Sequence, residues 1–445
     1  MVRISALLAA RIQMGVALGF HIVLAALGVG MPLFLLFAEW RANRTRDEVW
    51  MTMARRWAKA FGVLFAVGAA TGTVLSFALG LFWPKLMGDF GGVIGIVFAL
   101  EGIAFFGEAI FLGIYLYGWD RLSARAHLLA GVPIALCSAA SAWLIVSINS
   151  WMNTPQGFTL SASGNVIDVS AIHVLFNPAM AEQVVHMLLA AYMVTGFGLA
   201  SVYALGILKG RGGVYHRRAL ALGLAVGAVM APAQVVVGDW AARFVGTREP
   251  AKLAALEGQW ETQRRAPLRL GGIPNSNNET TPYAIEIPGA LSFLVYRDSG
   301  AEIVGLKAFP KDERPDVLPV HLAFQVMVAV GFGLVALGVV FAWVWWRKRR
   351  IPESKWFLRA VVLSGPAAFL AMETGWVVTE VGRQPWIVKD LMRTADAVTT
   401  RPGLGVYLVA TVAIYALLGA AAVWMLAKLA RRPLSDPASD GGYGG

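Results

Sequence analysis

The stretch METGWVVTEVGRQPW, residues 372–386, closes an apolar run that begins near Phe357 and is long enough to cross a bilayer. The run carries two carboxylates, Glu373 and Glu380. Because their separation is almost two helical turns, both lie on one helix face, about 10 Å apart. An ionisable group at membrane depth costs at least about 2.5 kcal/mol, so we interpret the pair as functional. The alternative is a helix end at which Glu380 pairs with Arg383.

The composition of the whole chain is that of a polytopic membrane protein. Of 445 residues, 57% are hydrophobic and 15% are charged, and the mean hydropathy is +0.62. These values exclude a soluble domain. The single cysteine, Cys137, permits no disulfide within the chain, no haem attached through a Cys-x-x-Cys-His motif and no iron–sulfur cluster. Any cofactor is therefore held non-covalently by other residues.

Nine apolar segments are long enough to span a bilayer, which predicts an all-α membrane protein. We place them at residues 15–37, 58–82, 92–117, 128–148, 184–208, 219–237, 320–346, 357–380 and 405–426. The first segment is too long for the core of a signal peptide and lacks a small-residue cleavage site, so we expect it to be retained.

Basic residues follow every second predicted helix, within residues 41–56, 121–125, 209–218, 347–350 and 428–432. Cytoplasmic loops carry an excess of lysine and arginine, so we expect the N-terminus outside and the C-terminus in the cytoplasm. Lys389, Arg393 and Arg401 follow the eighth helix and break this pattern. The net charge of +11 mostly reflects topology, and we expect no nucleic-acid partner.

Two connections on the predicted outer side are long. The chain divides into helices at 1–238, an outer loop at 239–319, further helices at 320–430 and a disordered tail at 431–445. The other long connection, 149–183, is polar and nearly uncharged. Long loops without regular structure are usually functional or disordered, so the outer loop is a candidate binding site.

Two of the six histidines, His21 and His186, lie inside apolar runs. A lone buried histidine is more often a hydrogen-bonded core residue than a ligand, but two within a bilayer favour ligation. Met327 lies in a third apolar run, and a histidine with a methionine forms a six-coordinate low-spin haem site. We interpret the remaining histidines as structural or solvated; they are His127, His173, His216 and His321.

A second carboxylate pair, Glu101 and Glu108, has the same seven-residue spacing. Two such pairs in one membrane protein are hard to explain structurally. The predicted topology places the candidate ligands in the outer half of the membrane; they are His21, Glu101, His186, Met327 and Glu380. It places Glu108 and Glu373 about two turns deeper, where we expect them to relay protons with water held by Ser138, Ser141 and Ser147.

These motifs together resemble subunit I of bacterial bd-type quinol oxidases. The resemblance spans essentially the whole chain and includes GRQPW at 382–386, AEQVVHMLLA around His186, FQVM around Met327, and the segments around His21 and Glu101. It implies haem cofactors without copper: a low-spin haem b, a high-spin haem b, and haem d or a third haem b. It assigns His186 and Met327 to the low-spin haem. It assigns His21 and Glu380 to the high-spin haems, with Glu101, Trp376 and Arg383 close to a haem.

The resemblance also implies an activity. The family oxidises quinol at the outer face, reduces oxygen to water and generates a proton gradient in the bacterial cytoplasmic membrane. It implies a second large subunit and a small single-helix subunit. The segment REPAKLAALEGQWET, residues 248–262, is similar to the quinol loop of the family, and there Glu257 is placed to act as a general base beside Lys252. Without that context this segment would be interpreted as an amphipathic surface helix.

Two departures from the family pattern matter. Gln325 stands where the family commonly has arginine, which is expected to shift the potential of the low-spin haem. The outer loop has the short form, as in the cyanide-insensitive branch, some members of which lack haem d.

Two other classes of protein compete with this interpretation. A proton-coupled secondary transporter would use the four intramembrane glutamates as a relay, but it leaves His21, His186 and Met327 unexplained. A haem–copper oxidase needs a histidine cluster for copper, and two buried histidines are too few.

Overall fold

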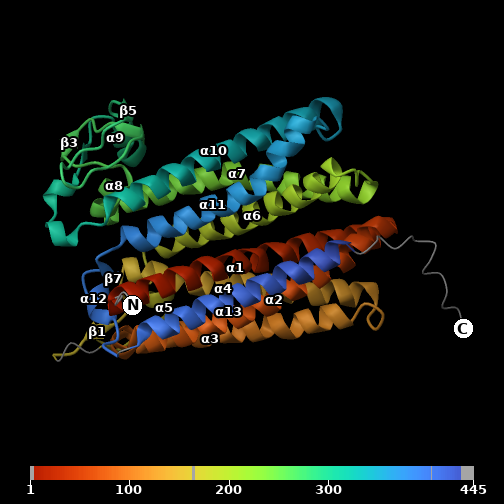
Figure 1. Ribbon diagram of the computed structural model, residues 1–445, viewed down its shortest axis with the longest axis horizontal. Helices are drawn as coiled ribbons and strands as arrows, with labels where there is room; N and C mark the ends of the chain where they lie inside the picture. The colour runs from red at the N-terminus through yellow and green to blue at the C-terminus, as the bar shows by residue number, and fades with distance from the viewer. Residues whose placement is uncertain (1–4, 163–165, 402, 432–445) are drawn as a thin grey trace, which may run out of the picture.

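The structure is a computed structural model that describes residues 5–162, 166–401 and 403–431 (Figure 1). Within these residues, nine helices are long and apolar enough to cross a membrane, which confirms the predicted fold class. They are α1 (Ala6–Thr45), α2 (Glu48–Phe82), α3 (Pro84–Tyr117), α4 (Ala124–Asn153), α6 (Met180–Leu208), α7 (Val214–Arg248), α10 (Val317–Lys348), α11 (Lys355–Gly382) and α13 (Leu404–Arg431). The tail expected to be disordered lies, from residue 432 on, outside the described part of the chain.

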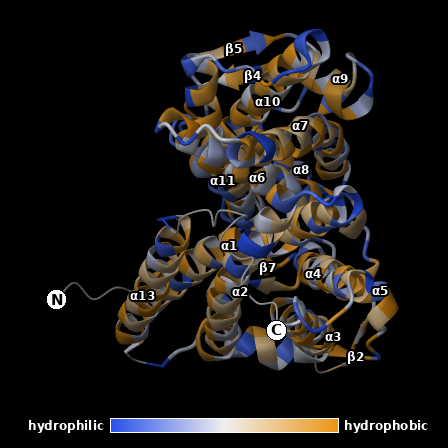
Figure 2. Ribbon diagram, turned by 90° about the vertical axis from the view of Figure 1, so that its right-hand side faces the viewer, coloured by the Kyte–Doolittle hydropathy of each residue, from blue (hydrophilic) through white to orange (hydrophobic). Residues whose placement is uncertain are grey.

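The nine helices run side by side along the long axis (Figures 1 and 2). Eight of them form two closed rings of four, and α13 lies outside both rings. Helices α1, α2, α3 and α4 make the first ring, and α6, α7, α10 and α11 make the second. The rings meet where α6 packs against α1 and α4, and α13 packs on α1 and α2. Many apolar side chains point outward from the rings, among them Phe77, Ile103 and Leu363, as expected for surfaces that face lipid or another membrane subunit.

The helices are longer than the apolar runs that predicted them, because polar residues stabilise additional turns at their ends. Helix α7 was expected to end at residue 237 but continues to Arg248. In these turns Asp239 pairs with Arg243 at 3.1 Å and with Arg297 at 2.6 Å. The outer connection therefore begins at residue 249 rather than 239.

Residues 249–316 fold into a small cap over the ends of α7 and α10, not into an irregular loop (Figure 1). Its helices are α8 (Pro250–Leu256) and α9 (Ala290–Tyr296), with 3-10 turns at Leu306–Ala308 and Lys311–Glu313. Its strands form two antiparallel pairs, β4 (Leu268–Gly271) with β5 (Ala284–Ile287) and β3 (Gln263–Arg264) with β6 (Glu302–Ile303). We call this segment the cap.

Shorter elements lie at the same end of the bundle as the cap. They are β1 (Thr159–Leu160), β2 (Val166–Ile167), α5 (Ala171–Leu175), β7 (Trp386–Val388), β8 (Met392–Arg393) and α12 (Thr394–Ala397). The start of α1 and the end of α13 lie at opposite ends of the bundle, as nine successive crossings require (Figure 1). The basic loops that follow α1, α3, α6 and α10, and the basic last turn of α13, lie at the end opposite the cap.

A buried hydrogen-bonded group joins α1, α3 and α4 near the end of the bundle that carries the basic loops, which we call the basic end. The His127 Nδ1 atom lies 2.8 Å from Glu39 Oε1, and its Nε2 atom lies 2.9 Å from the Tyr115 carbonyl oxygen. The Tyr115 hydroxyl donates to Glu39 Oε2 at 2.6 Å. His127 is therefore structural and buried, not solvated.

Replacing His127 by alanine is expected to lower the free energy of unfolding by about 3–5 kcal/mol, because Glu39 stays buried but loses the partner of its Oε1 atom and keeps only the Tyr115 hydroxyl. Unfolding in detergent micelles would measure the loss. The exposed His173, replaced by alanine, is the matched control. Equal stabilities of the two variants would contradict the prediction.

Candidate haem and quinol sites

His186 and Met327 both lie in the second ring. A Cβ atom added at Gly238 of α7 would lie 3.6 Å from His186 Cε1, and one added at Gly375 of α11 would lie 3.1 Å from Met327 Sδ. His186 Nδ1 is buried and has no hydrogen-bond partner among the described residues. A core histidine would normally be hydrogen-bonded, so this observation favours a ligand over a packing residue. Trp376 packs, half-buried, against the apolar cluster of this ring.

His21 of α1 faces α2. Its Nδ1 atom lies 3.1 Å from Thr71 Oγ1, and that hydroxyl donates to the Val67 and Gly68 carbonyl oxygens at 3.0 Å each. Because the hydroxyl proton is used there, His21 Nδ1 must be the donor to Thr71. This tautomer leaves the Nε2 lone pair available for a metal, as a haem ligand requires.

The carboxylates of α3 lie against α4 and near the middle of the bundle. Glu101 accepts a hydrogen bond from Ser141 Oγ at 2.7 Å, and Glu108 is buried two turns closer to the basic end. Glu101 lies near the midpoint of α3, which begins at Pro84, ahead of the apolar run that predicted the helix. Of the expected water-holding serines, Ser147 has a buried hydroxyl without a partner among the described residues.

Glu373 faces α1 two residues from His21. A Cβ atom added at Gly19 would lie 3.3 Å from Glu373 Oε2. Glu373 Oε1 is buried and has no hydrogen-bond partner among the residues that the structure describes. The structure therefore brings Glu373 close to the turn that carries His21.

Glu380 and Arg383 form an ion pair, as the alternative interpretation of this helix end predicts. Asn149 Nδ2 also donates to Glu380 Oε1 at 2.6 Å. The Arg383 Nε and Nη1 atoms are buried and unpaired with any described residue. Buried guanidinium donors without acceptors fit an additional anionic group, such as a haem propionate.

Two further residues near the cap end have buried polar side-chain atoms and were not predicted from the sequence. Both amide atoms of Gln13 and the Nε1 atom of Trp83 have no hydrogen-bond partner among the described residues. Trp83 and the neighbours of Gln13 on α1 pack in one apolar cluster. The presence of a glutamine inside an apolar run could have identified Gln13 as a candidate site residue. These donors also fit the carboxylates of a haem.

Lys252 and Glu257 are both buried, with 5% and 4% of their surfaces exposed, so a surface amphipathic helix is the wrong interpretation of α8. Lys252 Nζ donates to Glu249 Oε2 at 3.2 Å. A Cβ atom added at Gly382 would lie 3.2 Å from Lys252 Cε and Cγ. The cap is thus packed directly on the GRQPW segment, two residues from Glu380.

Glu257 is set apart from Lys252 and carries the chemistry of a general base. Burial raises the pKa of Glu257 to about 7, against the opposing effect of the positive charge on Arg269. Its Oε2 atom has no hydrogen-bond partner among the described residues. A buried carboxyl group with a pKa near neutrality and a free acceptor is suited to take a proton from a bound substrate.

Gln325 anchors the cap. Its Nε2 atom donates to the Arg269 carbonyl oxygen at 2.9 Å, and its Oε1 atom accepts from the Gly271 amide at 3.0 Å. The expected effect of Gln325 on a haem potential stays a prediction. The structure adds a second role, the attachment of β4 to α10.

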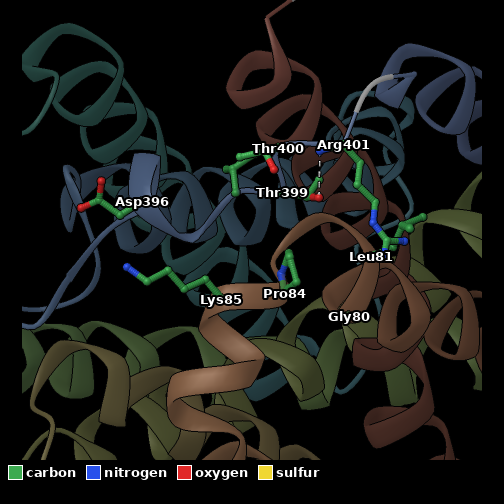
Figure 3. A pocket seen from close by; sticks show the side chains of 9 residues that line it. Gly80, Leu81, Pro84, Lys85, Asp396, Thr399, Thr400 and Arg401 are labelled. Carbon is green, nitrogen blue, oxygen red and sulfur yellow. Dashed lines mark hydrogen bonds between the residues drawn. The ribbon is translucent and has the colours of Figure 1, made fainter. Parts of the chain in front are cut away.

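A pocket of about 440 Å³ lies at the cap end of the first ring, between the α2–α3 corner and residues 396–401 (Figure 3). Lys85, Asp396 and Arg401 line it together with Thr399 and Thr400. It contains none of the residues predicted to bind haem or quinol.

Buried histidine, methionine and carboxylate side chains between membrane helices, with guanidinium N–H groups that lack acceptors among the described residues, fit a membrane protein that binds haem. The comparisons give the family. Residues 9–434 match cytochrome bd terminal oxidase subunit I, and the chain belongs to this family.

Two relatives and one solved structure are similar over nearly their whole length. A putative cytochrome bd menaquinol oxidase subunit I of Bacillus subtilis (strain 168) is 38% identical over 94% of this chain and 95% of the relative. A cytochrome bd ubiquinol oxidase subunit 1 of the same organism is 30% identical over 95% of this chain and 93% of the relative. The structure of bd oxidase from Geobacillus thermodenitrificans matches with a TM-score of 0.89 and 40% identity, over 97% of this chain and 100% of that one.

The chain is therefore a subunit of a quinol:oxygen oxidoreductase, a terminal oxidase of the bacterial cytoplasmic membrane. It uses haem cofactors and a quinol substrate, and it works with a second subunit in a membrane complex. The secondary transporter is not favoured, since the chain belongs to a family of terminal oxidases.

Proposed function

We propose that this subunit oxidises quinol at the membrane face that carries the cap, and that this face is the outer one. The basic loops at the opposite end support the orientation, since such loops are retained in the cytoplasm. The observation that carries the proposal is the buried Oε2 atom of Glu257, an acceptor without a partner among the described residues. We also propose that the complex contains a small single-helix subunit beside the second large subunit.

His186 and Met327 would hold a low-spin haem b. His21 and Glu380 would hold two high-spin haems, a haem b and either haem d or a third haem b, without copper. Bound haem supplies electron transfer at the six-coordinate site and oxygen reduction at the sites with an open position. Glu101 and Trp376 would line these sites, and Arg383 would bind a propionate through its unpaired donors.

In this proposal the cap binds quinol and accepts its proton. The Glu257 carboxylate accepts the proton of a quinol hydroxyl, and burial keeps water from competing for the same atom. Lys252, held by Glu249 and packed on Gly382, orients the cap against the helix that carries Glu380.

Replacing Glu257 by alanine is expected to slow quinol-dependent oxygen consumption by about 100-fold or more, because general-base catalysis contributes this much. The haem spectrum after reduction with dithionite should stay as in the unaltered protein. Wild-type quinol oxidation in this variant would contradict the assignment of Glu257.

Quinol oxidation is also expected to depend on pH. Glu257 must be deprotonated to act as a base, and its pKa is about 7. The rate at low quinol concentration should therefore rise as the pH increases through about 7 and level off above it. A steady-state pH profile measures this, and Glu257→Gln should remove the rise in rate near this pH.

A further inference from the structure

We propose that Arg269 of β4 is a further residue of the quinol site, where its guanidinium binds the quinol oxygen that loses a proton to Glu257. This inference rests on the proposed function of Glu257. No motif in the sequence singles out Arg269, and its role follows from contacts in the folded cap.

The guanidinium of Arg269 is oriented by groups of the cap. Its Nε atom donates to Glu286 Oε1 at 2.9 Å, and its Nη1 atom donates to Gln259 Oε1 and to the Gly258 carbonyl oxygen, the latter at 3.4 Å. Gln259 is itself buried, and its Nε2 atom donates to the Glu261 carbonyl oxygen at 2.6 Å. The two N–H groups of Nη2 have no acceptor among the described residues and are available to a ligand.

Helix α10 fixes Arg269 and Glu257 relative to one another. Gln325 binds the backbone of Arg269 and Gly271, as described above. One turn away, His321 is fully buried, with Nε2 3.0 Å from the Gly271 carbonyl oxygen and Nδ1 2.7 Å from that of Leu256, the residue before Glu257. The base and the guanidinium are therefore attached to one rigid helix, as a preorganised site requires.

Electrostatics connects the two side chains directly. The positive charge of Arg269 lowers the pKa of Glu257 against the larger effect of burial. Further charged or titratable groups on the surrounding elements include Glu286 on β5, Lys252 on α8 with its partner Glu249, and His321 on α10; Glu261 and Lys307 form an ion pair nearby. Of all these groups, Arg269 is the one whose charge acts on Glu257.

The chemical step balances within the established reaction. The quinol O–H bond breaks, its proton moves to the Glu257 carboxylate, and the oxygen keeps the electron pair as a quinolate. Arg269 stabilises that negative charge with a charge-assisted hydrogen bond. The quinolate then gives two electrons to the acceptors of the oxidase and its second hydroxyl proton to water at the outer face, which leaves the quinone. The electrons finally reduce oxygen, which the known activity supplies.

The test compares Arg269→Gln, Arg269→Lys and Glu257→Gln in the assembled oxidase, with the exposed Arg264→Gln of the same cap as the matched control. Quinol-dependent oxygen consumption is measured against quinol concentration across a range of pH. Arg269→Gln should lower kcat/KM about 10- to 100-fold, as the loss of a hydrogen bond to a charged group predicts. It should also move the midpoint of the pH profile upward, and Arg269→Lys should reverse part of both effects.

The direction of the pH shift separates a role in binding charge from a role in folding. Loss of the guanidinium charge raises the pKa of Glu257, whereas a loosened cap admits water and lowers it. An upward midpoint in Arg269→Gln thus supports the proposal, and a downward or unchanged midpoint overturns it. If Glu257→Gln oxidises quinol normally, the proposed function itself fails. If Glu257→Gln is defective while Arg269→Gln behaves like Arg264→Gln, the inference about Arg269 alone fails.

Discussion

Replacing His186 by alanine, or Met327 by leucine, is expected to abolish the low-spin haem and quinol-dependent oxygen consumption, with the protein still inserted in the membrane. A six-coordinate low-spin haem needs both axial ligands, so removal of either one opens the site. The geometry supports this pair, because small residues face both side chains and His186 Nδ1 has no protein partner among the described residues. The reduced-minus-oxidised visible spectrum of membranes measures the loss.

The matched control is Met187→Leu, which changes the neighbouring methionine of α6 in the apolar cluster of the same ring. Its low-spin spectrum should be unchanged, and its expression should equal that of the other two variants. A normal low-spin spectrum in both His186→Ala and Met327→Leu would exclude these residues as ligands.

The number of membrane helices could be predicted because bilayer thickness sets the length of each apolar run. Their ends could not, since polar turns continue the helices beyond the membrane. In α7 the ion pairs of Asp239 stabilise turns that no hydropathy pattern indicates. The cap was predicted to be a loop because its strands are short and its core joins side chains far apart in the chain, including those of α7, α10 and α11.

Some residues of the candidate site could likewise be predicted from the sequence, and others could not. Histidines and carboxylates inside apolar runs stand out against their surroundings, so His21, His186 and the glutamate pairs were visible in the sequence. Gln325 was noticed only as a departure from a family pattern, and its contact with β4 joins residues far apart in the chain. Arg269 is one of several arginines in a polar segment, and only the fold distinguishes it from Arg264.

Replacing both Glu108 and Glu373 by glutamine is expected to slow oxygen reduction by about 100-fold, while reduction of the low-spin haem by quinol stays fast. Oxygen reduction consumes protons, and the proposed haem ligands lie from the middle of the bundle towards the cap. Protons from the basic end must therefore cross about half of the membrane through groups that can be ionised or hydrated. Glutamine keeps the shape of each side chain but removes the exchangeable proton, at a cost typical of a lost acid or base.

The positions of the two glutamates support a proton relay along two routes, one on α3 and one on α11. Glu108 is buried on α3 two turns from Glu101, which is hydrogen-bonded to Ser141, and Glu373 faces Gly19 near His21. Buried carboxylate and hydroxyl oxygens that lack protein partners, such as Glu373 Oε1 and Ser147 Oγ, are where ordered water is expected. The two glutamates thus lie on separate approaches to the candidate high-spin sites, so the double variant is the informative one.

The measurement mixes quinol-reduced oxidase with oxygen and follows the haem spectra, then records membrane potential in reconstituted vesicles. The exposed Glu353→Gln near the basic end is the matched control and should behave as the unaltered protein. In the double variant, electrons should accumulate on the haems because protons no longer arrive with them, and the potential should fall in proportion to turnover. Normal turnover together with a normal membrane potential would show that protons reach the oxygen-reducing site by a path that uses neither glutamate.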